Sequence, residues 1–510
     1  MRRRKLIVLV VAVAAIVGAG AFAVVAAGRV RGSAAQTAAA YFAAWRKGDV
    51  LGMERLVHRP PGDFVTRHRE LSEKLHVDAI TLTPGPLRST GEESAEVPFA
   101  GVRLLTELGS WPFESTLRLA VRDQEWRVLW TPETLHPLLK DGARLELGEI
   151  DTTTAEFLTS EGARIPHDSY ADAYLDPLKP EFAETHQGWQ LLLKAPGQPD
   201  RPLLSRQPKA NVERTTLSRA VQAAAARALD AVDDSTIVVV RPSTGEILGL
   251  ADRLKEHYSA VRDVFPPGSV FKTITAAALL RAGLDPRSEV PCPGSYTVPG
   301  FRTITNDGGV DRGTVTFADA FAHSCNTTFV EQATTRLTSK DLADTAAEWG
   351  FGRPVVTGIG GSCGTVPETT DPDTFAEDAI GQGEVVTTPL CMAALAAAVQ
   401  NGTWRSPRLL SKGEVRRIDG VTSDDARMDE DVVRALRDLM SAVVDHGTAA
   451  DSGLPEGVAG KTGTAEVPDG PPHAWFIGYR DDLAFCVFVR HGGSGRGAAV
   501  PIAVRFLNGL

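Results

Sequence analysis

The segment at residues 266–280, PPGSVFKTITAAALL, constrains the fold more than any other stretch of the chain. Pro-Pro-Gly cannot lie inside a helix, whereas the residues from Val270 onward have a helical pattern, so we expect a helix to begin at or next to Ser269. Lys272 follows three residues later and should lie one turn along, on the same face as Ser269. The sequence therefore predicts a serine hydroxyl and a lysine amine side by side at a helix N-terminus.

Such a pair has a definite chemical use. A serine hydroxyl is a poor nucleophile unless an adjacent base takes its proton. A lysine is that base only when its amine is neutral, and burial or a second nearby cation lowers the lysine pKa accordingly. The two-residue pattern is weak by itself, because it turns up by chance about once in a chain of this length. The structural alternative is a helix-capping serine with a solvated lysine.

Two further motifs follow in order along the chain. They are Ser324-Cys325-Asn326 and, further on, Lys461-Thr462-Gly463-Thr464. Serine-x-x-lysine, a serine–asparagine motif and lysine-threonine-glycine, in this order, are the signature of penicillin-binding proteins and of class A β-lactamases. The three motifs together favour catalysis over the structural alternative.

The chain closely resembles the class B penicillin-binding proteins, the D,D-transpeptidases that crosslink peptidoglycan. Family-like stretches include TFADAFAHSCNTTFV, AIGQGEVVTTPLCMAALAAAVQNG and HGTAADSGLPEGVAGKTGTAE. For residues 213–510 the resemblance implies an α+β transpeptidase domain, an antiparallel five-stranded sheet flanked by helices on both faces. A mainly helical subdomain would carry Ser324.

The resemblance also implies roles for the catalytic residues. Ser269 would attack the penultimate D-alanine carbonyl of a stem peptide ending in D-Ala-D-Ala, and an acyl-enzyme would form. Lys272 would accept the Ser269 proton, Ser324 would relay a proton to the leaving amine, and the backbone N–H groups of Ser269 and Thr464 would form the oxyanion hole. An amine from a neighbouring stem peptide would then resolve the acyl-enzyme into a crosslink. β-Lactams would acylate the same serine because they mimic D-Ala-D-Ala.

The other motif residues would bind the substrate. Asn326 has an amide suited to holding the side-chain amide of the stem peptide. Lys461 would supply positive potential for the terminal carboxylate, and the hydroxyls of Thr462 and Thr464 would bind that carboxylate. Gly463 has no side chain, so the peptide backbone can approach the strand and pair with its edge.

Residues 34–140 are expected to form a separate small α+β domain. Helical residues at 34–47 precede strand-like stretches at 79–83, 95–105 and 115–130, which suggests an antiparallel sheet packed against helices. FAAWRKGDVLGMERL and WRVLWTPETLHPLLKDGARL resemble the NTF2-like domain that precedes the catalytic region in the methicillin-resistance type of penicillin-binding protein.

Residues 141–212 are interrupted by several prolines and are expected to be a linker or a reduced pedestal. The arginine-glycine stretch that usually opens the class B linker domain is absent, which agrees with a reduced pedestal. No glycan-polymerising domain precedes the transpeptidase. The resemblance therefore implies a partner that makes the glycan, a membrane-embedded glycan polymerase.

The N-terminus carries an export segment. Residues 6–27 have no charge and follow four consecutive basic residues, and they are long enough to cross about 30 Å of hydrocarbon as a helix. We interpret residues 1–28 as a cytoplasmic tip and a single transmembrane anchor at the bacterial cell membrane, with the catalytic domain extracytoplasmic. A cleaved signal peptide is the alternative, since residues 25–27 (VAA) resemble a cleavage site.

Composition excludes other classes of function. The chain has 54 Lys and Arg against 64 Asp and Glu, a net charge of −10, which argues against nucleic acid as a main partner. No histidine or cysteine spacing is typical of metal ligands, so we expect neither a metal nor another cofactor.

The chain has five cysteines, and outside the membrane, where conditions are oxidising, they can form disulfides. Cys292 and Cys363 lie in Gly/Pro-rich loops and are the candidate disulfide pair. Cys391 in an apolar helix and Cys486 in an apolar strand are interpreted as buried, unreactive thiols. Cys325 is expected to pack, not to react.

Three alternative functions stay open to test. A class A β-lactamase needs a Glu-x-x-Leu-Asn loop between the second and third motifs, and none of the glutamates there begins that pattern. A D,D-carboxypeptidase, which uses water as acceptor, has no such distinguishing motif. A non-catalytic scaffold or β-lactam sensor would not need all three motifs intact.

Overall fold

A computed structural model describes residues 30–255, 259–300 and 302–510. The predicted anchor, residues 1–28, lies outside the described residues. Within the described ranges, no helix combines the length and the apolar character needed to span a bilayer.

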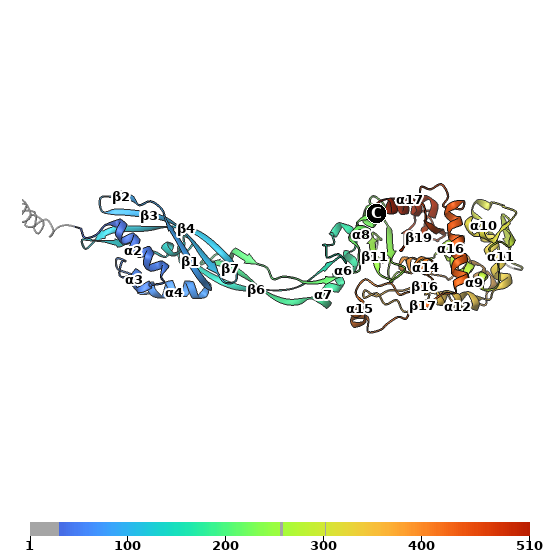
Figure 1. Ribbon diagram of the computed structural model, residues 1–510, viewed down its shortest axis with the longest axis horizontal. Helices are drawn as coiled ribbons and strands as arrows, with labels where there is room; N and C mark the ends of the chain where they lie inside the picture. Colours follow the sequence, from blue (N-terminus) through green and yellow to red (C-terminus); the bar gives the residue numbers. More distant parts are fainter. Residues whose placement is uncertain (1–29, 256–258, 301) are drawn as a thin grey trace, which may run out of the picture. The chain divides into compact units, whose positions relative to one another are not determined.

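The chain divides into two compact units, which are treated separately (Figure 1). The first unit comprises the residues up to Thr153 together with Glu184–Ala210. The second unit comprises Thr154–Ala183 and Asn211–Leu510. The chain thus leaves and re-enters the second unit before its main body begins.

The first unit packs helices against an antiparallel sheet of order β1-β3-β4-β5, with β2 paired to β3. Inward positions of β3 alternate with outward ones, so Val97 and Phe99 face the helices. The Phe42 ring, from α2, lies 5.1 Å from the Phe99 ring and joins helix to sheet. The elements are α2 (Ala34–Arg46), α3 (Val50–Glu54), α4 (Phe64–Lys74), β1 (Val77–Pro84), β2 (Arg88–Gly91), β3 (Ser94–Leu105), β4 (Gly109–Arg122), β5 (Glu125–Val128) and α5 (Pro132–Leu135).

The interior of this unit also contains polar groups. Arg103 is 3% exposed, donates to the Leu135 carbonyl at 2.8 Å and stacks over the Phe113 ring. Burial, together with the charge of Arg103, lowers the pKa of His68 to about 3. Burial likewise lowers the pKa of His136 to about 4, so both histidines are neutral in the folded unit at neutral pH.

Residues 141–212, for which a linker or reduced pedestal is expected, contain a four-stranded sheet of order β8-β7-β6-β9. Its strands are β6 (Arg144–Leu158), β7 (Glu184–Lys194), β8 (Arg201–Arg206) and β9 (Asn211–Arg214). β7 and β8 are antiparallel, whereas β9 runs parallel to the end of β6. Between β6 and β7 lie four short elements, η1 (His167–Ser169), α6 (Asp172–Leu175), η2 (Asp176–Leu178) and α7 (Lys179–Phe182).

The second unit is built on an antiparallel five-stranded sheet of order β11-β10-β20-β19-β18, which confirms the predicted sheet. Every residue of β10 is buried, as expected for a strand covered on both faces. β18, at one edge, carries the third motif. The strands are β10 (Ser235–Val240), β11 (Ile247–Asp252), β18 (Ala459–Ala465), β19 (His473–Arg480) and β20 (Leu483–Val489).

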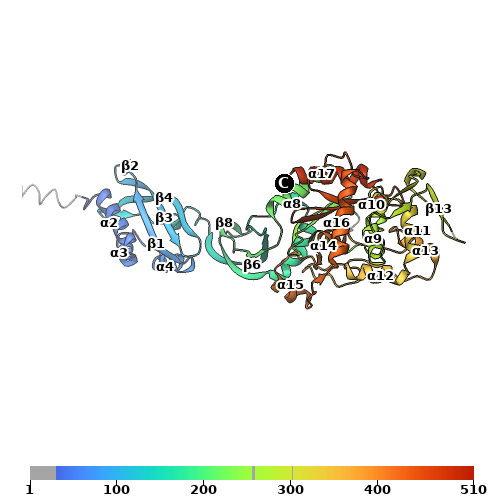
Figure 2. The same ribbon diagram turned by 45° about the vertical axis from the view of Figure 1, so that its right-hand side comes forward.

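Helices cover both faces of this sheet. α8 (Arg219–Ala228) and α17 (Val500–Asn508) pack against each other, while α14 (Pro389–Asn401) packs across β20 and β10 (Figures 1 and 2). α14 is apolar around its circumference because it is buried on nearly all sides. The other elements are η3 (Gly268–Phe271), α9 (Lys272–Arg281), β12 (Glu289–Pro291), β13 (Ser295–Thr297), β14 (Thr303–Thr305), η4 (Asp307–Gly309), β15 (Thr314–Thr316), α10 (Phe317–Ala322), α11 (Asn326–Arg336), α12 (Ser339–Glu348), α13 (Pro372–Asp378), β16 (Thr403–Trp404), α15 (Lys412–Asp419), β17 (Ala426–Arg427), α16 (Glu430–Asp445) and η5 (Gly495–Ala499).

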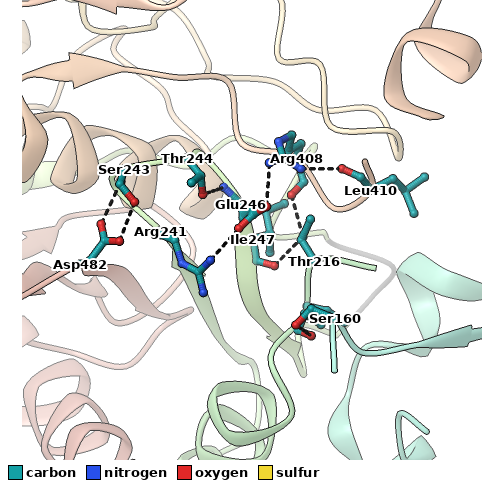
Figure 3. Close-up of polar contacts among 11 residues, drawn as sticks. Ser160, Thr216, Arg241, Ser243, Thr244, Glu246, Ile247, Arg408, Leu410 and Asp482 are labelled. Carbon is teal, nitrogen blue, oxygen red and sulfur yellow. Dashed lines mark hydrogen bonds and ion pairs between the residues drawn. The ribbon is translucent and has the colours of Figure 1, made fainter. Parts of the chain in front are cut away.

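A polar network joins the β10–β11 hairpin to more distant segments of the second unit (Figure 3). The Glu246 carboxylate accepts from Arg408 at 2.8 Å and from Arg241 at 2.9 Å. The Thr216 hydroxyl lies 2.8 Å from the Ile247 carbonyl oxygen and 2.9 Å from that of Arg408. Because these bonds are partly shielded from water, they fix the segment around Thr216 against the sheet of the second unit.

The disulfide prediction is wrong. Cys292 pairs with Cys325, and Cys363 pairs with Cys391, whereas Cys486 is a buried free thiol, as predicted. Loop composition indicated Cys292 and Cys363 as partners, but long-range hydrogen bonds decide the pairing.

Those hydrogen bonds bring each cysteine to its partner. Thr327, in the first turn of α11, donates to the Pro293 carbonyl at 2.9 Å, which places Cys292 beside the helix start. Thr388, the N-cap of α14, donates to the Ser362 carbonyl at 2.6 Å, which places Cys363 beside that helix. Cys325 and Cys391 are therefore covalent crosslinks, not merely packed thiols.

Candidate active site

Ser269 lies in the short helical turn η3, directly before α9 begins at Lys272. The turn is held by the Gly268 N–H, which donates to the Gly381 carbonyl at 2.8 Å. Gly268 has a φ of +54°, and a Cβ there would overlap the Thr464 carbonyl oxygen. Glycine at this position thus allows the Ser269 turn to lie directly against the third motif.

The Lys272 side chain is 0% exposed and reaches the second motif. Its Nζ donates to the Ser324 carbonyl at 2.7 Å, to the Ser324 hydroxyl at 3.3 Å and to the Asn326 side-chain oxygen at 2.6 Å. Burial, and secondly the charge of Lys461, lower the pKa of Lys272 well below its usual range. The structure records no hydrogen bond from Lys272 to the Ser269 hydroxyl, so Lys272 is seen here bound to the second motif.

Ser324 occupies the junction between α10 and α11 with a φ of +59°. This left-handed conformation is costly for a residue with a side chain and is characteristic of functional turns. The Ser324 N–H donates to the Phe321 carbonyl at 3.0 Å, and the next residue, Cys325, is tied to Cys292. A hydrogen bond and a disulfide thus hold the second motif in place.

Asn326 is engaged at both ends of its amide. Its oxygen accepts from Lys272, and its nitrogen donates to the Thr305 carbonyl of β14 at 2.9 Å. The orientation of Asn326 is therefore set by the protein itself.

Lys461 is also 0% exposed and points into the interior. Its Nζ donates to the Thr462 carbonyl at 3.1 Å and lies 5.5 Å from the centre of the Phe321 ring. Burial lowers the pKa of Lys461 to about 7. Lys461 thus contributes positive electrostatic potential from the protein interior and does not present its ammonium group to solvent.

The remaining residues of β18 meet three other segments. Thr462 Oγ1 lies 2.6 Å from Thr448 Oγ1, and Thr464 Oγ1 accepts from the Gly495 N–H at 3.3 Å. A Cβ on Gly463 would lie 2.9 Å from Val270 Cγ1, beside the Ser269 turn. The fold therefore brings the three motifs together at one edge of the sheet.

Sequence reasoning missed several residues of this site. Gly381 and Thr448 lie in the family-like stretches, yet a single sequence does not indicate that they touch Gly268 and Thr462. Gly495, whose N–H donates to Thr464 Oγ1, lies outside all three motifs. In the described part of the chain, no group of three or more histidine, cysteine or acidic side chains is arranged to hold a metal ion.

Two family models match the chain. Residues 235–508 match the penicillin binding protein transpeptidase domain. Residues 33–143 match the NTF2-like N-terminal transpeptidase domain.

Individual relatives agree with these families. The peptidoglycan D,D-transpeptidase PbpA of Mycolicibacterium smegmatis is 31% identical over 357 residues, 58% of this chain and 72% of the relative. Stage V sporulation protein D of Bacillus subtilis is 31% identical over 300 residues, 50% of this chain and 45% of the relative. The ceftriaxone acyl-enzyme structure of penicillin-binding protein A from M. tuberculosis superposes with a TM-score of 0.52 at 26% identity, covering 60% of this chain and 81% of that one.

Proposed function

The chain belongs to the penicillin-binding transpeptidase family, and from this premise we propose that it is a membrane-anchored peptidoglycan D,D-transpeptidase acting through a Ser269 acyl-enzyme. The observation that carries the proposal is the meeting of the motifs: Lys272 contacts Ser324 and Asn326, and the Ser269 turn lies against β18. Solved complexes of the M. tuberculosis relative with ceftriaxone, imipenem and penicillin G are acyl-enzymes, which supports β-lactam acylation here.

In the proposed first step, Ser269 Oγ attacks the penultimate D-alanine carbonyl. Lys272, whose lowered pKa favours the neutral amine, takes the Ser269 proton, and Ser324 passes a proton to the nitrogen of the departing D-alanine. The backbone N–H groups of Ser269 and Thr464 stabilise the oxyanion.

In the second step an amine of a neighbouring stem peptide attacks the ester. Its excess proton returns by way of Ser324 and Lys272, and the Ser269 hydroxyl is released as the new amide forms. Lys272, whose buried amine is hydrogen-bonded to Ser324, thus carries the proton between Ser269 and Ser324 in both directions.

The cellular setting is part of the same proposal. The charge-free segment at residues 6–27 after four basic residues supports a single-pass anchor at the bacterial cell membrane with an extracytoplasmic catalytic domain. A membrane-embedded glycan polymerase would supply the strands that the enzyme crosslinks.

The test is intact-mass spectrometry of residues 30–510 after incubation with benzylpenicillin, beside a Ser269→Ala variant. A single penicilloyl adduct that persists and is missing from the variant supports the proposal. An adduct that vanishes as penicilloic acid accumulates identifies a β-lactamase, and the lack of any adduct identifies a non-catalytic protein.

A second measurement separates transpeptidase from carboxypeptidase. A stem-peptide donor ending in D-Ala-D-Ala is incubated with and without an amino-acid acceptor, and both products are quantified. A transpeptidase forms the donor–acceptor product, whereas release of D-alanine with hydrolysed donor alone contradicts the proposal.

A further inference from the structure

The interior of the first unit holds a positive charge without a counterion. Arg103 is 3% exposed and lies on the helix-facing side of β3, and no carboxylate in the described part of the chain forms an ion pair with it. Burial lowers the pKa of Arg103 to about 9, so the guanidinium is still charged at neutral pH. A buried cation is strongly unfavourable unless an opposite charge lies beside it. The unit therefore needs an anion that these residues do not supply.

The Arg103 guanidinium is held in place, but one of its nitrogens is not used. Nη2 donates to the Leu135 carbonyl at 2.8 Å, and the guanidinium carbon lies 4.1 Å from the centre of the Phe113 ring. Nη1 is buried and has no hydrogen-bond partner. Gly101 allows the ring to cover the strand here, because a Cβ on Gly101 would lie 2.3 Å from it. The protein thus fixes Nη1 while its hydrogens stay unbonded.

A second unpartnered polar atom lies in the same aromatic interior. His68, from α4, is 5% exposed, and its Nε2 is buried without a hydrogen-bond partner. After burial, the charge of Arg103 is the second cause of the lowered His68 pKa, so the two side chains are electrostatically coupled. Trp130 Nε1 and the Tyr41 hydroxyl, which are also buried here, face each other. Arg103 Nη1 and His68 Nε2 are therefore the groups of this interior that are left for a ligand.

The chemistry of these two atoms selects a small anion. An arginine N–H only donates hydrogen bonds, and a neutral histidine can donate from Nε2. A ligand that accepts from both and cancels the charge of Arg103 is a monovalent anion. Because neither atom reaches solvent, the ion has to be small, about the size of one water molecule or of a carboxylate group.

We propose that the first unit encloses a small monovalent anion, a halide or the carboxylate of a small acid, which accepts hydrogen bonds from Arg103 Nη1 and His68 Nε2. The ion neutralises the buried guanidinium, whereas burial keeps His68 itself neutral. The stability of the unit then depends on which anions surround the protein. The inference is independent of the chemistry at Ser269.

The test follows the unfolding of residues 30–510 by calorimetry in sodium chloride or sodium formate. Sodium gluconate, whose anion is too bulky for an enclosed site, keeps the ionic strength constant. Hydrogen exchange in residues 94–122 assigns the transition to the first unit. Its unfolding temperature should rise by about 3 to 6 °C for each tenfold increase in the small anion once the site fills. A response to chloride alone identifies a halide, a response to formate alone identifies a carboxylate, and a response to both shows that the site takes either.

Three variants separate anion binding from a structural role of Arg103. Arg103→Met removes the need for a counterion, so its unfolding temperature should not respond to chloride or formate. In gluconate alone it should be at least as stable as the wild type, because an apolar side chain replaces an uncompensated buried charge. His68→Phe loses one hydrogen bond and should need about 10-fold more anion for the same rise. Arg118→Met, at an exposed arginine of the neighbouring strand β4, is the control and should keep the wild-type response.

The opposite results overturn the inference. A wild type with the same unfolding temperature and hydrogen exchange in chloride, formate and gluconate has no anion site, and this holds even where Arg103→Met does not fold. An Arg103→Met variant that is destabilised equally in all three salts shows a structural role alone. An equal response in Arg103→Met and in the wild type places the anion effect elsewhere in the chain.

Discussion

Lys272 Nζ and Asn326 Oδ1 lie 2.6 Å apart, so the base expected from the first motif is held by the second. The same amine also donates to the Ser324 carbonyl at 2.7 Å. Burial and the Lys461 charge lower the pKa of Lys272 and so disfavour its protonated form. The Ser324 carbonyl and the Asn326 side-chain oxygen orient the amine. The protonation of Lys272 is therefore controlled by residues far from it in the sequence.

Asn326→Asp places a carboxylate beside Lys272 without changing the shape of the side chain. An opposite charge raises a lysine pKa, so less of the amine is neutral and benzylpenicillin acylation at pH 7 should fall at least about 10-fold. The rate should recover as pH rises, because Lys272 then deprotonates. Acylation rates between about pH 6 and pH 10 check this. Asn401→Asp, at a residue that contacts Arg405, is the control, and a pH-independent loss would contradict the expectation.

Lys461→Met tests the second influence on Lys272. The Lys461 charge lowers the Lys272 pKa, so its removal should raise that pKa and move the acid limb of the acylation profile to higher pH. The midpoint of the limb, not the maximal rate, is the quantity to compare. An unchanged or lowered midpoint would show that the two ammonium groups are not coupled.

Cys292→Ser should affect acylation more than Cys363→Ser. The cysteines of the two disulfides are 33 and 28 residues apart in the sequence. Each disulfide should therefore stabilise the folded state by about 3 to 4 kcal/mol, because it restricts the conformations of the unfolded chain. Only the first anchors Cys325, between Ser324 and Asn326. Thermal unfolding and acylation rates are measured for both variants, and equal acylation rates would mean that the second motif does not need its covalent tie.

Gly381→Ala should slow acylation about 100-fold while the unit still folds. Gly381 has a φ of +76°, and its Cβ would overlap the Gly268 carbonyl oxygen and the Phe271 side chain, which displaces the Ser269 turn. Displacement of a reacting group by about 1 Å can cost about 100-fold in rate. Gly420→Ala is the matched control, since Gly420 has a φ of +68° with nothing within 4 Å of a Cβ. Similar acylation rates in the two variants would rule out this role for Gly381.

His68→Phe should flatten the pH dependence of the first unit's stability. In the folded unit the pKa of His68 is about 3, below the usual 6.5. The contribution of His68 to the stability of the unit is therefore complete above pH 6.5 and is lost as pH falls towards 3. The wild type should therefore lose up to about 1.4 kcal/mol per pH unit relative to His68→Phe in that window. Calorimetry of residues 30–510 between about pH 7 and pH 5 measures the difference, and parallel curves would show that His68 is not buried in the neutral form.

Much of the site could be predicted where the determining physics is local. Pro266-Pro267-Gly268 prevents a helix from starting earlier, and three residues of helix carry the chain from Ser269 to Lys272. The unbroken β-branched and apolar run of β10 likewise indicates a strand buried on both faces. Neighbours along the chain are sufficient for such conclusions.

The sequence by itself determined the family, the order of the three motifs and the five-stranded sheet. Only the tertiary structure decided that Cys292 pairs with Cys325, that Gly381 supports the Ser269 turn and that Gly495 lies beside Thr464. Each of these contacts joins segments far apart in the chain, and it depends on whether a Cβ fits or a hydrogen bond closes once the helices pack on the sheet. Composition and motif spacing do not indicate how close such distant segments come in the folded chain.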